Sequence, residues 1–438
     1  TQMNSKKIIV IGGSAAGPKA ASRARRLDEN AMITIYQKAS DLSMASCGYP
    51  YYIGGFFNDR NQLLCSPAGV VRDSKFFLNA KNINAVVNTE VTAIDRKNKR
   101  IEFTNLFTGE KGSDSYDKLI ITTGASPRKP PVPGIELEGV TTLHSLLDAD
   151  YLRQIRDKGE IKKAVVIGGG LIGIETCEAL HLAGIEITII ELLPQLLTFL
   201  DKQMARLVEK YLQTKANVIL KNGVTAFLGE NGKLTAVKLQ NGTEIPCELA
   251  VVAIGVSPNI KLAQDAGIKI GHAGGIQVNE YMQTNDPDIY AAGDCVEIPN
   301  LITGESVLAP YGDLANLEGR VAGENVIMGN VARFPGTIQT GICKVFDYGV
   351  GSTGLSERNA LQQGFDTIET VVNASLDKPG FMQGKLLITK LVVNKTNGNI
   401  LGAQVIGPGE VSKQVATWAM AIKGNLTIDD MVNADLPY

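Results

Sequence analysis

Two short apolar segments rich in β-branched residues each lead into a glycine-rich turn that a helical pattern follows. The first is residues 7–11 with the turn 12–17, and the second is residues 163–167 with the turn 168–173. In such a turn the first glycine permits a tight bend, a small middle residue lets the backbone approach a pyrophosphate, and the helix offers free N–H groups to phosphate. The pair predicts two parallel-sheet units, each able to hold a dinucleotide.

The two turns differ at the residue that ends the next strand. The strand after the second turn, 185–190, ends at Glu191, whereas the strand after the first turn, 32–36, ends at Gln37. A carboxylate at this place binds the ribose 2′-hydroxyl of NADH and repels the 2′-phosphate of NADPH. Gln37 can hydrogen-bond a ribose without charge. We expect helices from Pro18 to Leu27 and from the second turn to about Ala183.

Composition excludes several classes of partner. The 438 residues suggest about two to four domains, and the net charge of −2 gives no reason to expect nucleic acid or an anionic membrane as partner. No apolar run is long enough for a membrane span, and residues 1–7 lack an apolar leader. Three scattered histidines and six cysteines without paired spacing predict no metal site. A cytoplasmic protein is therefore expected.

Three later segments strengthen the dinucleotide interpretation. Residues 116–125 read as a strand that ends in a small-residue turn, and residues 254–259 read as a strand end followed by a break. Residues 288–294 read as a strand that delivers Asp294 to a helix start. A strand-end aspartate is commonly only a helix cap. The order of the three segments after the glycine turns favours contact with a ligand instead.

Residues 43–55 contain one cysteine, Cys47, and no second cysteine nearby. The positions where a disulfide partner would stand hold Leu42 and Tyr52. Cys47 must therefore act alone, as a thiolate, a mixed disulfide or a sulfenate. We expect it to begin a helix, whose amino end favours the thiolate, with Ser43 or Ser46 adding a hydrogen bond. The alternative is a buried structural cysteine, the reading that we give to the other five.

Together these segments resemble the flavin- and pyridine-nucleotide-dependent disulfide reductase superfamily, over nearly the whole chain. Residues 43–55 resemble its single-cysteine branch, which includes coenzyme A-disulfide reductases, coenzyme A-persulfide reductases, NADH oxidases and NADH peroxidases. The resemblance implies an α/β fold with two Rossmann-like dinucleotide-binding domains, for FAD and NAD, and an α+β carboxy-terminal dimerisation domain. The implied domains are 1–124 with 272–330 for FAD, 125–271 for NAD(P)H, and 331–438 for dimerisation.

The resemblance also implies site residues, which are carried over position by position. For FAD these are Gly12, Ser14, Ala16, Gly17, Gln37, Val91, Thr123, Gly124, Arg128 and Asp294. For NADH, with NADPH less favoured, they are Gly168, Gly170, Ile172, Gly173, Glu191 and Gly255. For a substrate that includes coenzyme A, the resemblance implies Arg26 and Lys81; Arg23 is added because it lies three residues before Arg26 on the same helical face, and Ser43 and Ser46 because they adjoin Cys47. The catalytic residues are Cys47 and Tyr438. For the basic residues among them, a merely solvated surface is the alternative.

Residues that the chain lacks exclude one mechanism of the superfamily and disfavour some members of the single-cysteine branch. No histidine follows His272, which excludes the carboxy-terminal histidine–glutamate couple of disulfide reductases with an internal cysteine pair. Ala15 stands where peroxidases and many oxidases carry a histidine, which favours the coenzyme A branch. In that branch the partner protomer of a homodimer contributes tyrosines to a shared site. Residues 436–438 match one of these stretches, whereas residues 377–381 end in Phe381 and offer no hydroxyl.

The sequence thus predicts a dimeric flavoprotein that passes electrons from NADH through FAD to Cys47. Its expected acceptor is a small sulfur compound: coenzyme A disulfide, coenzyme A persulfide or polysulfide. One alternative is an NADH oxidase that reduces oxygen through a Cys47 sulfenate. Another is a redox sensor or an electron-transfer flavoprotein that serves a protein acceptor.

Overall fold

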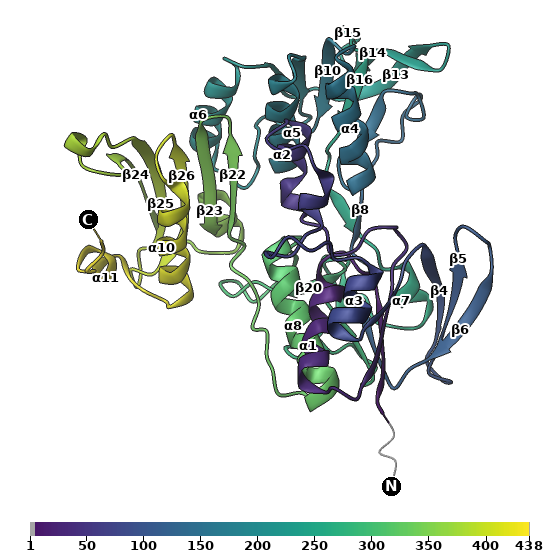
Figure 1. Ribbon diagram of the computed structural model, residues 1–438. Coiled ribbons are helices and arrows are strands. Elements are labelled where there is room, and N and C mark those ends of the chain that lie inside the picture. The colour runs from purple at the N-terminus through teal and green to yellow at the C-terminus, as the bar shows by residue number, and fades with distance from the viewer. Residues whose placement is uncertain (1–4, 438) are drawn as a thin grey trace.

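The computed structural model describes residues 5–437 and contains three five-stranded sheets (Figure 1). The first sheet is entirely parallel, with the order β19-β7-β1-β2-β3. Its strands are β1 (Lys7–Ile11), β2 (Met32–Tyr36), β3 (Asn84–Val86), β7 (Lys118–Ile121) and β19 (Ile289–Ala291). The apolar run of β1 is buried because strands flank it on both edges and helices cover the sheet.

The second sheet repeats this design, with the order β12-β11-β10-β16-β9 and only parallel pairs. Its strands are β9 (Val140–Thr142), β10 (Lys163–Ile167), β11 (Glu186–Ile190), β12 (Asn217–Ile219) and β16 (Leu249–Val252). The predicted strands that flank both glycine turns are confirmed. The helices after the turns begin slightly differently from the prediction: α1 is Ala16–Leu27 and α5 is Leu171–Leu182.

The third sheet is antiparallel, with the order β22-β23-β26-β25-β24. Its strands are β22 (Gly341–Val345), β23 (Tyr348–Gly354), β24 (Ile368–Leu376), β25 (Leu386–Asn394) and β26 (Ile400–Gly407). The helices α9 (Glu357–Gln362), α10 (Val411–Lys423) and α11 (Ile428–Val432) accompany it. Strand β24 forms one edge and is mostly exposed, whereas every residue of β26 is buried.

Smaller antiparallel elements complete the structure. They are β4 (Thr89–Asp95) with β5 (Arg100–Asn105) and β6 (Lys111–Ser115), β13 (Val224–Glu230) with β14 (Lys233–Leu239) and β15 (Glu244–Pro246), and β18 (Ile276–Gln277) with β20 (Val296–Pro299) and β21 (Ser306–Leu308). A ribbon of β8 (Ala125–Pro127) and β17 (Val256–Pro258) carries the chain between the first two sheets. The other helices are α2 (Tyr49–Ile53), α3 (Ser74–Lys81), α4 (Leu146–Lys158), α6 (Lys202–Leu212), α7 (Lys261–Asp265) and α8 (Gly312–Met328).

Late segments of the chain return to the first sheet. Strand β19 pairs with β7, and α8 lies beside α1, as Figure 1 shows. Glycines allow this close approach: a Cβ added at Gly319 would lie 2.5 Å from the Ala16 carbonyl oxygen, and one at Gly323 would lie 2.3 Å from that of Ala20. The resemblance-based domain boundaries stay a prediction.

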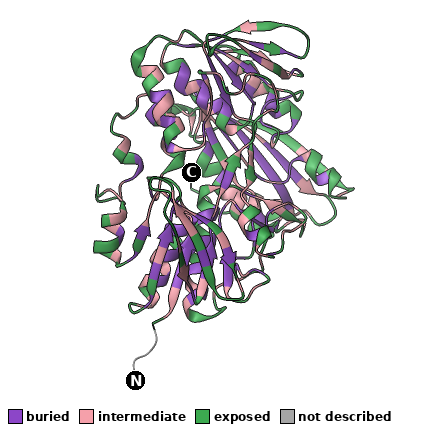
Figure 2. Cartoon of the chain, turned by 90° about the vertical axis from the view of Figure 1, so that its right-hand side faces the viewer, coloured by how far each residue is buried: buried purple, intermediate pink, exposed green. Residues whose placement is uncertain are grey.

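The buried residues lie mainly in the strands of the sheets and in the helix faces that pack against them. In Figure 2 most strands of the large sheets are buried, and helices present exposed faces outside them. Within the described residues, no helix combines the length and the apolar composition that a membrane span requires.

Candidate active site

Cys47 lies at the surface in a one-turn 3₁₀ helix, Ser46–Gly48, directly before α2. It is the one exposed cysteine: Cys65 is partly buried, and the other four are buried. The buried structural alternative for Cys47 is therefore wrong. The expected helix exists but begins two residues later, at Tyr49, and is short. A single-turn helix supplies little dipole, so the exposure of the sulfur is the feature that makes it available for chemistry.

The segment that carries Cys47 is fixed by packing against the second unit. Tyr49, Tyr52 and Ile53 of α2 are buried in one apolar cluster with residues of α4 and α5. Arg153 of α4 donates hydrogen bonds of 2.8 Å to the carbonyl oxygens of Tyr52 and Phe57. These contacts hold the cysteine between the first and second dinucleotide units.

The first glycine turn has the features of a phosphate site. No side chain caps the amino end of α1, and its first turn contains no acidic residue, so its N–H groups are free for a ligand phosphate. A Cβ added at Gly17 would lie 1.9 Å from the Gly12 carbonyl oxygen, which only glycine avoids. Gln37 is buried, and its Oε1 accepts a 2.9 Å hydrogen bond from the Gly13 N–H. The predicted residues Gly12, Ser14, Ala16 and Gly17 all belong to this turn and fit the diphosphate of FAD.

The second turn has the same geometry. Gly170 caps α5 without a side-chain hydrogen bond, and the first turn again lacks an acid. Glu191 Oε1 accepts a 2.9 Å hydrogen bond from the Gly169 N–H, and its Oε2 accepts one of 2.8 Å from the Leu193 N–H. Ile172 is exposed beside the turn, and Gly168 and Gly173 approach each other closely. These residues fit a second dinucleotide.

The other residues assigned to the cofactors lie near the ribbon between the units, with one exception. Thr123 donates to the Asn259 carbonyl oxygen at 2.7 Å, and Arg128 Nε donates to Ser257 Oγ at 3.0 Å. Gly124 and Gly255 adopt φ of +67° and +96°, and no atom lies within 4 Å of a Cβ added at either. Val91 differs: its side chain is 8% exposed in the core of the first unit, so only its backbone could face a ligand.

The expectation that Asp294 begins a helix is wrong: it lies in the turn between β19 and β20. Next to it is a buried carboxyl group that the sequence did not single out. Burial raises the pKa of Asp294, and His144 offsets part of this rise. Glu318 of α8 is 1% exposed and accepts a 2.9 Å hydrogen bond from the Gly293 N–H. Burial raises the pKa of Glu318 to about 8, although the Gly293 N–H acts against it and Asp294 and Asp313 add to it. No sequence signal marks an acid in the middle of a helix as buried.

The predicted substrate residues have different surroundings: Lys81 and Arg26 lie near each other, Arg23 is paired with a carboxylate, and Ser43 and Ser46 lie near Cys47. Lys81 donates to Ser22 Oγ at 2.8 Å, which places α3 against the face of α1 that carries Lys19 and Arg26. Arg23 instead forms a 3.1 Å ion pair with Glu324 of α8. Ser46 is exposed beside Cys47, and Ser43 accepts a 3.3 Å hydrogen bond from Arg72. Arg72 lies in a loop without a motif, which is why sequence reasoning missed it.

Tyr438 lies outside the described residues, so the structure does not place this predicted catalytic group. The neighbouring Leu436 is 52% exposed at the end of the described chain. The proposed contribution of this tail to a partner's site stays a prediction.

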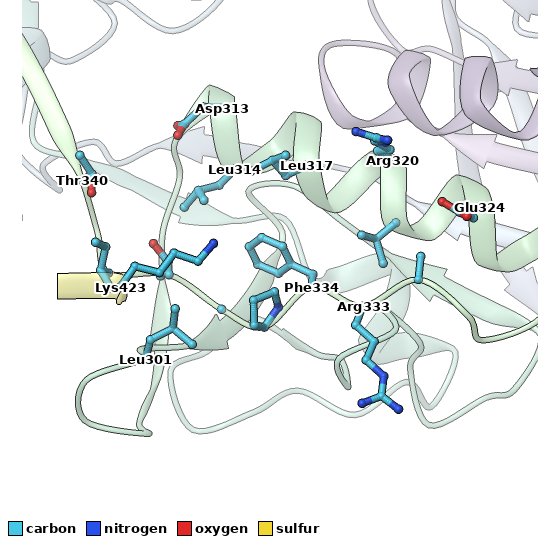
Figure 3. A pocket seen from close by; sticks show the side chains of 16 residues that line it. Leu301, Asp313, Leu314, Leu317, Arg320, Glu324, Arg333, Phe334, Thr340 and Lys423 are labelled. Carbon is cyan, nitrogen blue, oxygen red and sulfur yellow. The ribbon is translucent and has the colours of Figure 1, made fainter. Parts of the chain in front are cut away.

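A cavity of about 450 Å³ lies elsewhere, between α8 and the segment 332–340, and Lys423 of α10 also lines it (Figure 3). None of the residues predicted for cofactor, substrate or catalysis lines this cavity. Within the described residues no group of His, Cys, Asp or Glu could hold a metal ion. The candidate active site is therefore the surface around Cys47, between the two glycine turns.

Comparison with known proteins identifies the family. The pyridine nucleotide-disulphide oxidoreductase family matches residues 6–306, and the dimerisation domain of that family matches residues 340–438. The chain belongs to the pyridine nucleotide-disulphide oxidoreductase family, and it is an oxidoreductase. FAD and a nicotinamide dinucleotide are the cofactors of this class, in agreement with the two glycine turns.

Individual relatives fall within the predicted branch. The NAD(P)H coenzyme A polysulfide/persulfide reductase of Pyrococcus horikoshii is 34% identical, over 99% of this chain and 94% of its own length. An NADH oxidase of Methanocaldococcus jannaschii is 31% identical over the same shares. The solved NAD-dependent persulfide reductase from A. fulgidus superposes with a TM-score of 0.96 and 42% identity, over 99% of this chain and 79% of that one.

Proposed function

We propose that this protein uses NADH to reduce coenzyme A disulfide or coenzyme A persulfide through Cys47. The observation that carries the proposal is the position of Cys47. Its sulfur is exposed, and its segment is tied to the first glycine turn and borders a group of cations that includes Arg72, Lys81 and Arg26. The tie is the hydrogen bond of 2.8 Å from the Ser43 N–H to the Gly13 carbonyl oxygen. The relatives that act on coenzyme A compounds support the choice of substrate.

The reaction is balanced without any further reagent. The Cys47 thiolate attacks one sulfur of coenzyme A disulfide, the S–S bond breaks, and one coenzyme A leaves as a thiolate. The second coenzyme A remains as a mixed disulfide on Cys47. The first glycine turn would hold FAD, whose flavin would supply the route by which the two electrons of NADH reach this mixed disulfide. The sum is NADH, one proton and coenzyme A disulfide giving NAD⁺ and two coenzyme A molecules.

The residues of the chain have separate tasks in this cycle. Glu191 selects the unphosphorylated ribose of NADH, since a carboxylate repels a 2′-phosphate. Arg26 and Lys81 hold the nucleotide end of coenzyme A, whose phosphates need cations on a surface that is otherwise near neutral. The leaving thiolate takes its proton from the partner's Tyr438 or from water, because Phe381 has no hydroxyl. The site is shared between the two protomers of a homodimer.

Replacement of the cysteine tests the proposal. Cys47→Ser should abolish reduction of coenzyme A disulfide and persulfide, while NADH still bleaches the bound flavin at the wild-type rate. Stopped-flow absorbance measures the flavin step, and thiol release measures turnover. Cys65→Ser is the matched control and should keep full activity. Turnover of the Cys47→Ser variant on the sulfur substrates would refute the mechanism.

An NADH oxidase is the second candidate, and the relative from Methanocaldococcus jannaschii supports it. In that reaction oxygen is the acceptor, and Cys47 passes through a sulfenate. Oxygen consumption with NADH, compared with turnover on coenzyme A disulfide by the same preparation, separates the two functions.

A further inference from the structure

We propose that Arg72 determines substrate specificity by binding the diphosphate of a nucleotide-bearing thiol. This inference rests on the proposed function, because it names the group that reads the diphosphate of that substrate. Four observations carry it: the contact of Arg72 with the cysteine segment, the loop that presents it, the cations that lie near it, and the absence, among residues 5–437, of ion pairs between these cations and carboxylates.

Arg72 contacts the segment that carries the reactive sulfur. Its Nη1 donates to Ser43 Oγ at 3.3 Å. Ser43 adopts φ of +53°, a left-handed conformation that few residues other than glycine take. Its N–H donates to the Gly13 carbonyl oxygen at 2.8 Å, so both the main chain and the side chain of Ser43 are held. The guanidinium of Arg72 thus contacts Ser43, which lies four residues before Cys47 in the sequence and beside the first glycine turn.

The loop that presents Arg72 is bonded to the cysteine segment. The Ala45 N–H donates to the Leu63 carbonyl oxygen at 2.8 Å, and the Arg72 N–H donates to that of Leu64 at 2.9 Å. The neighbouring carboxylate, Asp73, accepts a 2.9 Å hydrogen bond from the Phe76 N–H at the start of α3. Asp73 therefore acts as a helix cap, and it forms no ion pair with Arg72.

Arg72 belongs to a cluster of four cations from three segments, which we call the basic cluster: Lys19 and Arg26 of α1, Lys81 of α3, and Arg72. Burial and the positive charges of Arg26, Arg72 and Lys19 lower the pKa of Lys81, as expected where cations converge. None of the four forms an ion pair with a carboxylate among residues 5–437. By contrast, the nearby Arg23 is paired with Glu324. Unpaired, converging cations constitute a site for a polyanion.

The four cations of the basic cluster are spaced so that different members can bind different phosphates of coenzyme A. Lys19 and Arg26 are two turns apart, which is about 10 Å along α1. Arg26 and Lys81 form the far end and suit the 3′-phosphate, whereas Arg72 lies at the end next to Cys47 and suits the diphosphate. A guanidinium is a forked donor, so Arg72 can bond a phosphate with one nitrogen while another keeps Ser43 in place.

Three disulfides that differ only in phosphate test the assignment on the full-length holoenzyme: those of coenzyme A, of dephospho-coenzyme A, which lacks the 3′-phosphate, and of pantetheine, which lacks every phosphate. Arg72→Gln should lower kcat/KM for the first two by about tenfold to 100-fold, as expected for a lost charge-assisted hydrogen bond. Its kcat/KM for pantetheine disulfide should stay within twofold of the wild type. Arg72→Lys should recover part of the loss, because it restores the charge without the fork.

Two further variants sharpen the comparison. Arg26→Gln should impair coenzyme A disulfide more than dephospho-coenzyme A disulfide, which Arg72→Gln should not. Lys75→Gln is the matched control: it removes an exposed cation of α3 that does not face Lys81, and all three rates should be retained. If Arg72→Gln lowers kcat/KM equally for all three disulfides, Arg72 acts only through the cysteine segment, and the proposal is overturned. No loss on any of them would overturn it too.

The failure of the proposed function is distinguishable from the failure of this inference. If the wild-type enzyme reduces none of the three disulfides, the proposed function fails. Calorimetric titration with coenzyme A, dephospho-coenzyme A and pantetheine then still tests Arg72. Weaker binding of the first two ligands to Arg72→Gln, with no change for pantetheine, supports the assignment, and unchanged binding of all three contradicts it.

Discussion

Gln37 and Glu191 occupy equivalent positions in the two dinucleotide units and make the same hydrogen bond. Each places its Oε1 2.9 Å from the N–H of the second glycine in its turn, Gly13 or Gly169. The amide of Gln37 shows that this bond does not require a negative charge. The charge of Glu191 is thus available for a different purpose, which we take to be the choice between NADH and NADPH.

Glu191→Gln tests that purpose while its amide oxygen can still accept from the Gly169 N–H, although the bond from the Leu193 N–H is lost. Because Gln37 keeps the equivalent hydrogen bond, the variant should fold and bind FAD as the wild type does. It should lose the repulsion of the 2′-phosphate, so the preference for NADH over NADPH should fall by about tenfold or more. Steady-state kcat/KM for the two dinucleotides is the measurement. An unchanged ratio would mean that other residues select the nucleotide.

Glu318 should make the stability of the fold depend on pH. Its pKa is raised to about 8 in the folded state, so the folded protein binds this proton more tightly than the unfolded chain does. The stabilisation is complete below the ordinary pKa of a glutamate, about 4.5, and is lost as the pH rises through about 8.

Glu318→Gln keeps an acceptor for the Gly293 N–H and cannot ionise. The variant should therefore be more stable than the wild type at pH 9, by ~1.4 kcal/mol for each pH unit that separates the pKa of Glu318 in the unfolded chain from its pKa in the folded protein, and similar to it at pH 5. Thermal unfolding of the holoenzyme at both values is the measurement. A variant that gains nothing at pH 9 would argue against a buried, ionisable Glu318.

At the scale of elements, a buried ion network joins the second unit to the third sheet. Lys390 of β25 is fully buried, and its Nζ lies 3.1 Å from Asp201 Oδ2 and 2.6 Å from Glu357 Oε2. Gln404 of β26 donates to Asp201 at 2.7 Å. Burial acts to raise the pKa of Asp201, but the Glu357 N–H, Gln404 and Lys390 outweigh it, so the pKa is lowered. Stability from Asp201 is consequently present at neutral pH and is lost in acid, below about pH 4.

Lys390→Met should destabilise the protein by about 3 kcal/mol or more, because it leaves the Asp201 carboxylate buried without its cation. Urea unfolding at pH 7 measures the change. The double variant Asp201→Asn with Lys390→Met should recover much of the loss, since the buried Asp201 charge is then removed and the unpaired Glu357 side chain, 38% exposed, is accessible to water. A double variant no more stable than Lys390→Met would show that packing, and not charge, accounts for the effect.

The elements that were predicted from the sequence are those that local patterns determine. The strands Lys7–Ile11 and Lys163–Ile167 are unbroken apolar runs, and the turns after them contain glycines that only a close approach explains. Arg72 and Glu318 could not be predicted because their roles depend on contacts between distant segments. Arg23 illustrates the same limit: helical spacing placed it with Arg26, but α8 brings Glu324 to it.

At the scale of the whole molecule, exposed apolar side chains mark a surface for a second protomer. Val371, Val372 and Leu376 of the edge strand β24 are each at least 50% exposed, and Phe381 in the following turn is 85% exposed. Apolar side chains gathered at an exposed sheet edge commonly mark an association surface. This surface lies in the part of the chain that matches the dimerisation domain.

Phe381→Glu combined with Val372→Glu should separate the protomers. Sedimentation velocity should show the wild type at twice the chain mass of 46.8 kDa and the variant at the chain mass. Because the site is shared in the proposed dimer, turnover on coenzyme A disulfide should fall with the dimer. Phe107→Glu is the matched control, since Phe107 is 78% exposed in the first unit, and it should leave the mass unchanged. If the variant remains dimeric, the dimer interface lies on another surface of the protein.

The central claim is that Cys47 forms a mixed disulfide with coenzyme A during the reaction. Mass spectrometry of the intact protein without reductant, after incubation with coenzyme A disulfide and followed by peptide mapping, tests it most directly. We predict one adduct with the mass of coenzyme A on Cys47, removed by dithiothreitol and absent from Cys47→Ser. An unmodified Cys47, or an adduct on the partly buried Cys65 instead, would contradict it.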